Sequence, residues 1–197
     1  MSIICANVKI SGIRPLLFNR FNEDAIPITR QEKSGVPGNN PEEWKKTFQI
    51  TTDRQLYLDP IYIFSCLRAG GKFISKGRGT LEPDIASTLQ VLDTKILINR
   101  FLPPITEVTR NEKDNVYIDV RPVSRRGVKN IRYRLAVSPG WETEFHIVWE
   151  GTIINREQMR AVCQDAGAFA GLGDARKVGF GRFEVTEFNI IQGKVYA

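Results

Sequence analysis

The residues best suited to chemistry lie in a glycine-rich segment, residues 171–181. Two Gly–hydrophobic–Gly triplets are separated by five residues, which include Arg176 and Lys177. Glycines permit positive φ angles and close approach of another backbone, and exposed N–H groups in such a loop can bind phosphate oxygens, with the two cations adding charge. The alternative is a helix-to-strand connection whose glycines only permit tight packing. The candidate anion-binding residues are Gly171, Gly173, Arg176, Lys177, Gly179 and Gly181.

The segment does not fit the known nucleotide-cofactor loops. No Gly-Lys-Ser/Thr follows it, and it lacks the strand-then-helix order of a dinucleotide-binding turn. A bound nucleotide cofactor is therefore not expected.

Two clusters of basic residues are candidates for binding a polyanion. The first lies within 121–134, a stretch without Asp or Glu, where a protruding hairpin would form a positive arm for a phosphate backbone. The second lies within 68–78, where a spacing of four would place three cations on one helical face. For both clusters, ordinary solvated charges are the alternative. The residues are Arg121, Arg125, Arg126, Lys129, Arg132 and Arg134 in the first, and Arg68, Lys72, Lys76 and Arg78 in the second.

The sequence offers little for catalysis or metal binding. His146 is the single histidine, on an expected strand among glutamates and without a recognisable Ser, Cys or Asp partner, so we expect a structural role. Cys5, Cys66 and Cys163 have no CxxC spacing, which with one histidine excludes a Cys/His zinc site. The cysteines are expected to be small buried side chains in a reducing compartment. We expect no metal, no cofactor and no catalytic activity.

Length and composition are typical of a globular protein that binds a polyanion. The 197 residues are 42% hydrophobic and 25% charged, which excludes disorder, and the net charge of +6 with a pI of about 9.3 favours an anionic partner. No stretch approaches the ~18 consecutive apolar residues of a membrane span. The alternating start of the chain does not resemble a signal peptide. We expect a cytoplasmic protein with no membrane contact.

The elements that must position these residues follow from periodicity and helix caps. Asp59 is a candidate N-cap for a helix over 61–69, and Asn155 with Gln158 predicts a capping box for a helix over 156–169. The alternation of the last strand slips between Val185 and Phe188, which predicts a β-bulge. Strands are expected at 4–11, 55–58, 88–98, 116–123, 130–137, 143–149 and 183–190.

Without its long excursions, the order is strand, helix, strand, strand, helix, strand. This order predicts an α+β fold with an RRM/ferredoxin-like core, a single domain over 1–197 with insertions at about 19–55 and 100–138. A protruding basic β-hairpin would belong to the second insertion. On the 143–149 strand, Glu142, Glu144 and Glu150 would face away from the core. These acids disfavour base stacking on the open face of the sheet, so a bound strand should run over the loops and the hairpin.

The glycine-rich segment, between a helix and the last strand, resembles the loop of the repeat-associated mysterious protein (RAMP) superfamily, the RNA-binding proteins of CRISPR systems. The chain is most similar to the backbone subunits that polymerise along a guide RNA. Residues 8–12, 15–22 and 116–137 resemble the family's opening strand, the Asn/Arg-containing stretch that follows it, and its thumb hairpin. The resemblance covers both ends of the chain well and the middle in outline. It implies contacts of Arg14, Arg20 and Arg30 with an RNA backbone.

The resemblance also implies a function in antiviral defence. We expect sequence-independent binding of single-stranded guide-type RNA, or of single-stranded DNA, which has the same phosphate groups. Copies of the protein would stack head-to-tail in a filament, with other effector subunits as partners. One alternative is a metal-independent endoribonuclease of the same superfamily with His146 as its base. Asp24 lies where some backbone subunits place a metal-assisted acid, although two adjacent acids in a loop are more often solvated. Another alternative is a protein adaptor or phage structural protein that does not bind nucleic acid.

Overall fold

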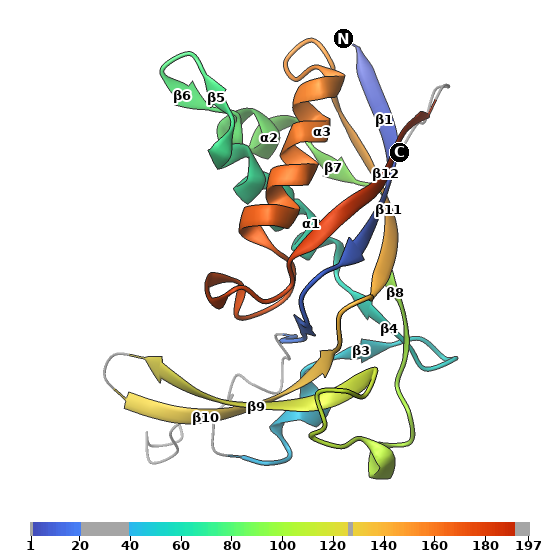
Figure 1. Cartoon of the computed structure of the whole chain (residues 1–197). Coiled ribbons are helices and arrows are strands. Elements are labelled where there is room, and N and C mark those ends of the chain that lie inside the picture. The colour runs from blue at the N-terminus through green and yellow to red at the C-terminus, as the bar shows by residue number, and fades with distance from the viewer. Residues whose placement is uncertain (1, 21–39, 126–127, 192–197) are drawn as a thin grey trace, which may run out of the picture.

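The computed structural model describes residues 2–20, 40–125 and 128–191, without the side chains of residues 124, 125, 128 and 129. Within these residues, helices lie on one face of an antiparallel sheet, and a long β-hairpin extends from one end (Figure 1). The predicted α+β class is confirmed. The helices are α1 (Pro60–Gly70), α2 (Glu82–Thr88) and α3 (Arg156–Asp165), with short 3-10 turns at Glu43–Lys46, Gly71–Phe73, Ile105–Glu107 and Arg176–Val178 and a π-helical turn at Ala166–Ala170.

The main sheet has the strand order β12-β1-β11-β8-β4-β3, and β7 also pairs with β11. The first strand of the chain is thus hydrogen-bonded between the last strand and β11. The strands are β1 (Ile3–Gly12), β3 (Gln49–Ile50), β4 (Gln55–Leu58), β7 (Gln90–Val91), β8 (Ile96–Phe101), β11 (Glu142–Glu150) and β12 (Phe183–Ile191).

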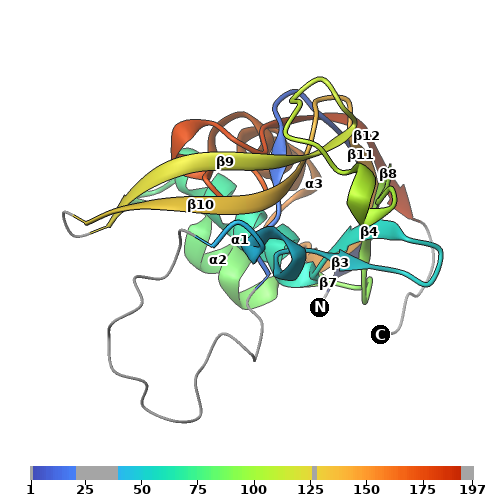
Figure 2. The same ribbon diagram turned by 90° about the horizontal axis from the view of Figure 1, so that it is seen from below.

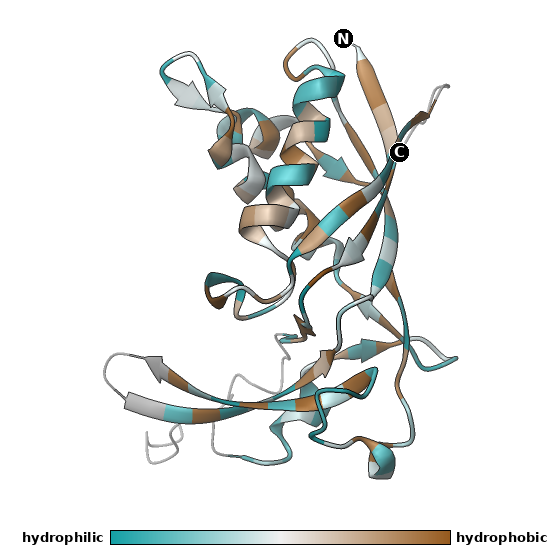
Figure 3. Ribbon diagram, viewed as in Figure 1, coloured by the Kyte–Doolittle hydropathy of each residue, from teal (hydrophilic) through white to brown (hydrophobic). Residues whose placement is uncertain are grey.

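Alternation along the central strands separates a core face from an open face. On β1, Val8 and Ile10 are buried, and their partners on β11 are Phe145 and Thr143. The helices cover this face, so apolar side chains of the sheet and of α1 and α3 form one hydrophobic core. Hydrophilic residues alternate with apolar ones along α3 (Figure 3).

The helix ends follow the predicted caps. The Asp59 side chain accepts a hydrogen bond from the Ile61 N–H at 2.9 Å, and Asn155 and Gln158 form the reciprocal capping box. The helix predicted over 156–169 is α-helical to Asp165 and continues as the π-helical turn. The wider turn forms where the chain leads from α3 into the glycine-rich segment.

The predicted strand over 88–98 is wrong in its first part. The chain forms α2 up to Thr88, then the two-residue strand β7, and only from Ile96 the strand β8. Pro83 between Glu82 and Asp84 is a favourable helix start, and Ile85 and Leu89, four residues apart, are both buried.

The long hairpin consists of β9 (Val116–Arg125) and β10 (Val128–Val137), and β10 also pairs with β2 (Leu16–Leu17). Figure 2 shows the two strands side by side. A second, short hairpin, β5 (Ser75–Lys76) and β6 (Gly79–Thr80), lies at the opposite end of the molecule (Figure 1).

The bulge predicted in the last strand is confirmed. Lys9 of β1 pairs with Glu187, whereas the next residue, Ile10, pairs with Val185, so Thr186 is the extra residue. Among the helices that the described residues form, none combines the length and the apolar character that crossing a bilayer requires.

Candidate nucleic-acid interface

The glycine-rich loop is built by close backbone contacts. Gly171, Gly173, Gly179 and Gly181 all have positive φ, as predicted. A Cβ on Gly173 would lie 2.4 Å from the Leu17 carbonyl oxygen, and one on Gly181 would lie 1.9 Å from that of Leu172. These contacts hold the loop against the segment that follows β1, so here the glycines serve close packing.

The expectation that the N–H groups of this loop are free for phosphate is wrong for most of them. The N–H of Leu172 donates to Gly181, that of Asp174 to Leu17 and that of Gly181 to Pro15, at 2.8–2.9 Å. The N–H groups of Gly171 and Gly179 donate to carbonyls of the preceding turns. Gly171, Gly173 and Gly181 are also buried. Any anion at this loop must therefore be bound mainly by side chains.

Residues 13–20 lie between the loop and the hairpin. On one side, the N–H groups of Ile13 and Arg14 donate to Arg182, next to the loop, and on the other the Phe18 N–H donates to Leu135 of β10. Arg14 and Arg20 of this segment are exposed, as is Lys177 of the loop, and Arg176 is half-buried. Within the described residues, the side chains of these four cations form no ion pair.

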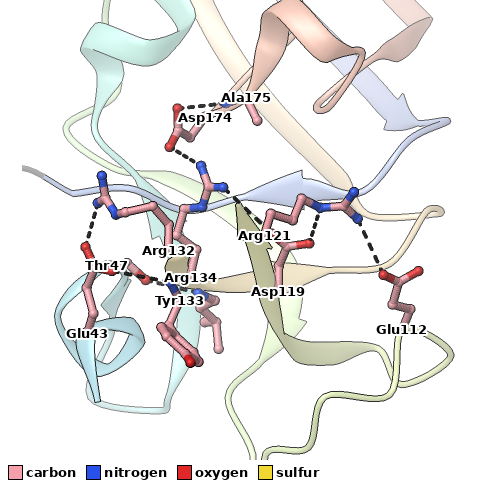
Figure 4. A network of polar contacts seen from close by, with 11 residues as sticks. Glu43, Thr47, Glu112, Asp119, Arg121, Arg132, Tyr133, Arg134, Asp174 and Ala175 are labelled. Atoms are coloured by element: carbon pink, nitrogen blue, oxygen red, sulfur yellow. Dashed lines mark hydrogen bonds and ion pairs between the residues drawn. The ribbon is translucent and has the colours of Figure 1, made fainter. Parts of the chain in front are cut away.

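The arginines at the base of the hairpin are neutralised by acids from other parts of the chain. Arg132, a candidate for RNA binding, pairs with Glu43 at 2.6 Å (Figure 4). Arg134 is buried at 4% exposure and pairs with Asp174 of the loop at 2.6 Å. The absence of acids within 121–134 thus does not leave these cations free, because folding brings the acids from elsewhere. Arg126 lies outside the described residues, as do the side chains of Arg125 and Lys129.

Asp119 of β9 connects Arg121 and Arg134 of the hairpin. It is buried, its Oδ1 accepts a hydrogen bond from the Nε of Arg121 at 2.6 Å, and its Oδ2 lies 3.8 Å from Arg134 (Figure 4). Burial raises the pKa of this carboxyl above its ordinary value, although the hydrogen bond from Arg121 and the charge of Arg134 act in the opposite direction. The ion pairs of Asp119, Arg134 and Asp174 therefore join the hairpin to the glycine-rich loop.

A cavity of about 350 Å³, which we call the loop–hairpin cleft, opens between these elements. Arg121 lies in its wall, with its guanidinium carbon 4.5 Å from the centre of the Phe180 ring. Its Nη2 is 3.4 Å from an oxygen of Glu112. The residues that line the cleft are Arg14, Pro15, Glu112, Arg121, Val178, Gly179 and Phe180.

The second basic cluster is not brought together with the first. Arg68 and Lys72 both pair with Glu82, and Lys76 pairs with Asp84 at 2.7 Å. The three cations do not share one helical face, because α1 ends at Gly70, so only Arg68 belongs to it. Arg78 is exposed without an ion pair in the described part of the chain, and it lies in the turn of the β5–β6 hairpin.

His146 has a partner that the sequence did not reveal. Its Nδ1 is 3.1 Å from Oδ1 of Asp93, and its backbone N–H donates to the other carboxylate oxygen at 2.6 Å. The pairing of β7 with β11 places Asp93 here. The Nε2 lies 3.4 Å from the amide nitrogen of Asn7. Both ring nitrogens thus contact the protein, as in a structural histidine. Asp24 lies outside the described residues.

The open face of the sheet is acidic, as predicted. A cavity of about 510 Å³ on this face is lined by Glu142, Glu144 and Glu187 among others, and Lys9 pairs with the latter two. The two cations that line the loop–hairpin cleft, Arg14 and Arg121, thus lie apart from this acidic cavity.

The three cysteines are buried and unpaired, and within the described residues no cluster of His, Cys, Asp and Glu is placed to hold a metal ion.

Comparison by sequence finds no matching protein-family model and no matching curated protein. Comparison by structure finds a chain in the cryo-EM structure of the Type III-B Cmr-beta bound to cognate target RNA, with a TM-score of 0.53. The two chains share a fold. The match covers 96% of this chain but only 61% of the other, at 12% sequence identity. At this identity the match shows the shared fold alone.

Proposed function

We propose that this protein binds single-stranded RNA of guide type through the phosphate backbone, as a non-catalytic RAMP subunit of an antiviral effector complex. The observation that carries the proposal is the fold shared, over 96% of the chain, with a chain of an RNA-bound assembly. Copies of the protein would stack head-to-tail along the strand, in contact with other effector subunits in the cytoplasm. Single-stranded DNA, which offers the same phosphates, is the competing ligand.

The strand order supports the finer assignment to an RRM/ferredoxin-like core. The last strand, β12, lies beside β1, and β11 lies on the other side of β1. Such an order is what a β-α-β-β-α-β unit produces when its two helices cover one face. In this proposal residues 1–197 are one domain with insertions at about 19–55 and 100–138, and the second insertion contributes the hairpin together with Glu112 and Arg121 of the cleft.

The distribution of charge supports backbone binding at the loop–hairpin cleft. Arg14 lines the cleft and Lys177 directly precedes Val178 of its wall. Arg20 and Arg176 lie on the same two segments without lining the cleft, and the acids of the sheet line a separate cavity. The hairpin tip, with Arg125, Arg126 and Lys129, would complete the path of the strand. Cations that bind phosphates release counterions, so the affinity should fall steeply with salt.

The test is fluorescence anisotropy of a labelled uridine oligonucleotide against rising salt. For single strands the logarithm of affinity changes by about 0.7 per phosphate contact for each decade of salt. The double variant R14E/K177E should therefore lower the slope by about 1.4 and weaken binding to unrelated sequences alike. The matched control is R156E/R160E, which places the same charge change on exposed positions of α3. Equal binding by both variants would contradict the proposal.

The endoribonuclease alternative has one observation in its favour, the orientation of His146 by Asp93. Against it, Nε2 faces an amide nitrogen and the neighbouring acids repel phosphate. Incubation of the purified protein with end-labelled RNA decides between the two. Cleavage that disappears in H146A would establish the endoribonuclease.

A further inference from the structure

The loop–hairpin cleft has the size and walls of a pocket for a planar ring. Its volume of about 350 Å³ is at the lower end of the range, roughly 300–1,000 Å³, of small-molecule sites. Pro15, Val178 and Phe180 supply apolar surface, and Val178 is 74% exposed at the rim. A phosphate group alone would not need such walls.

Arg121 and Phe180 both line this cavity. The guanidinium of Arg121 lies over the Phe180 ring, with 4.5 Å between the guanidinium carbon and the ring centre. The hydrogen bond from Nε to the buried Asp119 fixes the orientation of the group, yet the side chain is still 39% exposed. Unstacked bases of single-stranded RNA are commonly bound on such guanidinium planes.

Glu112 supplies hydrogen-bond acceptors beside that plane. One of its oxygens is 3.4 Å from Nη2 of Arg121, and its side chain is 70% exposed. An ionised carboxylate only accepts hydrogen bonds. Among the bases of RNA, guanine alone presents two adjacent donors, N1–H and N2–H, on its Watson–Crick edge, whereas adenine presents an acceptor next to a donor. Arg14, at the mouth of the cleft, is free to contact the phosphate of the same nucleotide.

We propose that the loop–hairpin cleft binds one unstacked nucleobase of the RNA strand and prefers guanine. The ring stacks on the guanidinium of Arg121, and its Watson–Crick edge donates to Glu112. This inference rests on the proposed function, because a bound strand must present the base. It adds one sequence-dependent contact to a binding mode that is otherwise independent of sequence.

The first test compares uridine oligonucleotides that differ at one central position. A central guanosine should bind about tenfold more tightly than adenosine, since a bidentate contact to the correct base discriminates by roughly 1–3 kcal/mol. Inosine, which lacks the N2 amino group, should be intermediate. Guanosine with carbon in place of N7 keeps its Watson–Crick edge and should bind like guanosine. Equal affinity for the oligonucleotides with guanosine, adenosine, inosine and the N7-substituted guanosine would overturn the inference.

The second test removes the carboxylate. E112Q should abolish the preference for guanosine while retaining binding of the plain uridine oligonucleotide. E107Q is the matched control, because Glu107 is also exposed and its loss changes the net charge equally, but it lines a different cavity. A guanosine preference that survives E112Q would overturn the inference. Failure to bind any oligonucleotide would overturn the proposed function as well, so the two failures are distinguishable.

Discussion

Removal of Arg134 should reveal how strongly the hairpin is tied to the glycine-rich loop. In R134M the buried carboxylate of Asp119, whose side chain is 1% exposed, loses one of its two cations, and Asp174 loses its partner at 2.6 Å. Breaking a buried pair in this way costs about 3–5 kcal/mol. Because Asp174 is 32% exposed and Arg121 remains, we expect the lower limit, about 3 kcal/mol.

The loss of stability in R134M should depend on pH. The pKa of Asp119 is higher in the folded protein than in the unfolded chain. Its contribution to stability is therefore present at low pH, where the carboxyl is protonated, and is lost as the pH rises through the folded pKa. Arg134 lowers that pKa, so its removal raises the pKa further. The difference between R134M and the unsubstituted protein should therefore shrink as the pH falls from neutral toward the titration range of Asp119.

Urea unfolding followed by circular dichroism measures the effect. A loss of about 3 kcal/mol in a chain of this size corresponds to a melting temperature lower by about 6–12 °C. The double variant D119N/R134M should recover part of the loss, because no charge is then left buried at position 119. R156M, at an exposed site of α3, should change stability by less than about 0.5 kcal/mol. A loss below about 1 kcal/mol for R134M, or no recovery by D119N, would refute this reasoning.

Other predictions concern the loop, the histidine and the thiols. G181A should lower the melting temperature much more than G179A, because an added Cβ at position 181 would lie 1.9 Å from the Leu172 carbonyl oxygen. At position 179 the added Cβ would meet open space, so only the ~1–2 kcal/mol cost of a left-handed residue remains. Equal losses of stability in the two variants would argue against a packed loop. H146A should leave RNA affinity unchanged, and a large loss would place RNA on the sheet. Burial raises the pKa of the Cys66 thiol to about 12, so a thiol reagent should label it only in urea; rapid labelling of the native protein would contradict its burial.

Sequence patterns predicted the parts of the fold that depend on neighbouring residues. The capped starts of α1 and α3 are local events, as is the bulge at Thr186, and each is where the sequence indicated. The helix α2 was missed although Glu82, Pro83 and Asp84 form a favourable start. The segment is only seven residues long, so its periodicity is too brief to distinguish it from a strand.

The charge state of the candidate site could not be predicted, because it depends on distant residues. Glu43 precedes Arg132 by 89 positions and Asp174 follows Arg134 by 40 positions, yet both pairs form ion pairs at 2.6 Å. Similarly, Asp93 reaches His146 only through the pairing of β7 with β11. A stretch without acids indicates free positive charge only where no other element folds onto it.

The most direct test of RNA binding is size-exclusion chromatography of the protein purified without nuclease, with absorbance at two wavelengths, before and after ribonuclease. The account predicts a nucleic-acid-rich spectrum in a large assembly that ribonuclease converts to a smaller, protein-only species. Deoxyribonuclease should have no effect, which separates RNA from single-stranded DNA. A protein-only spectrum, with an elution volume that neither nuclease changes, would contradict the account.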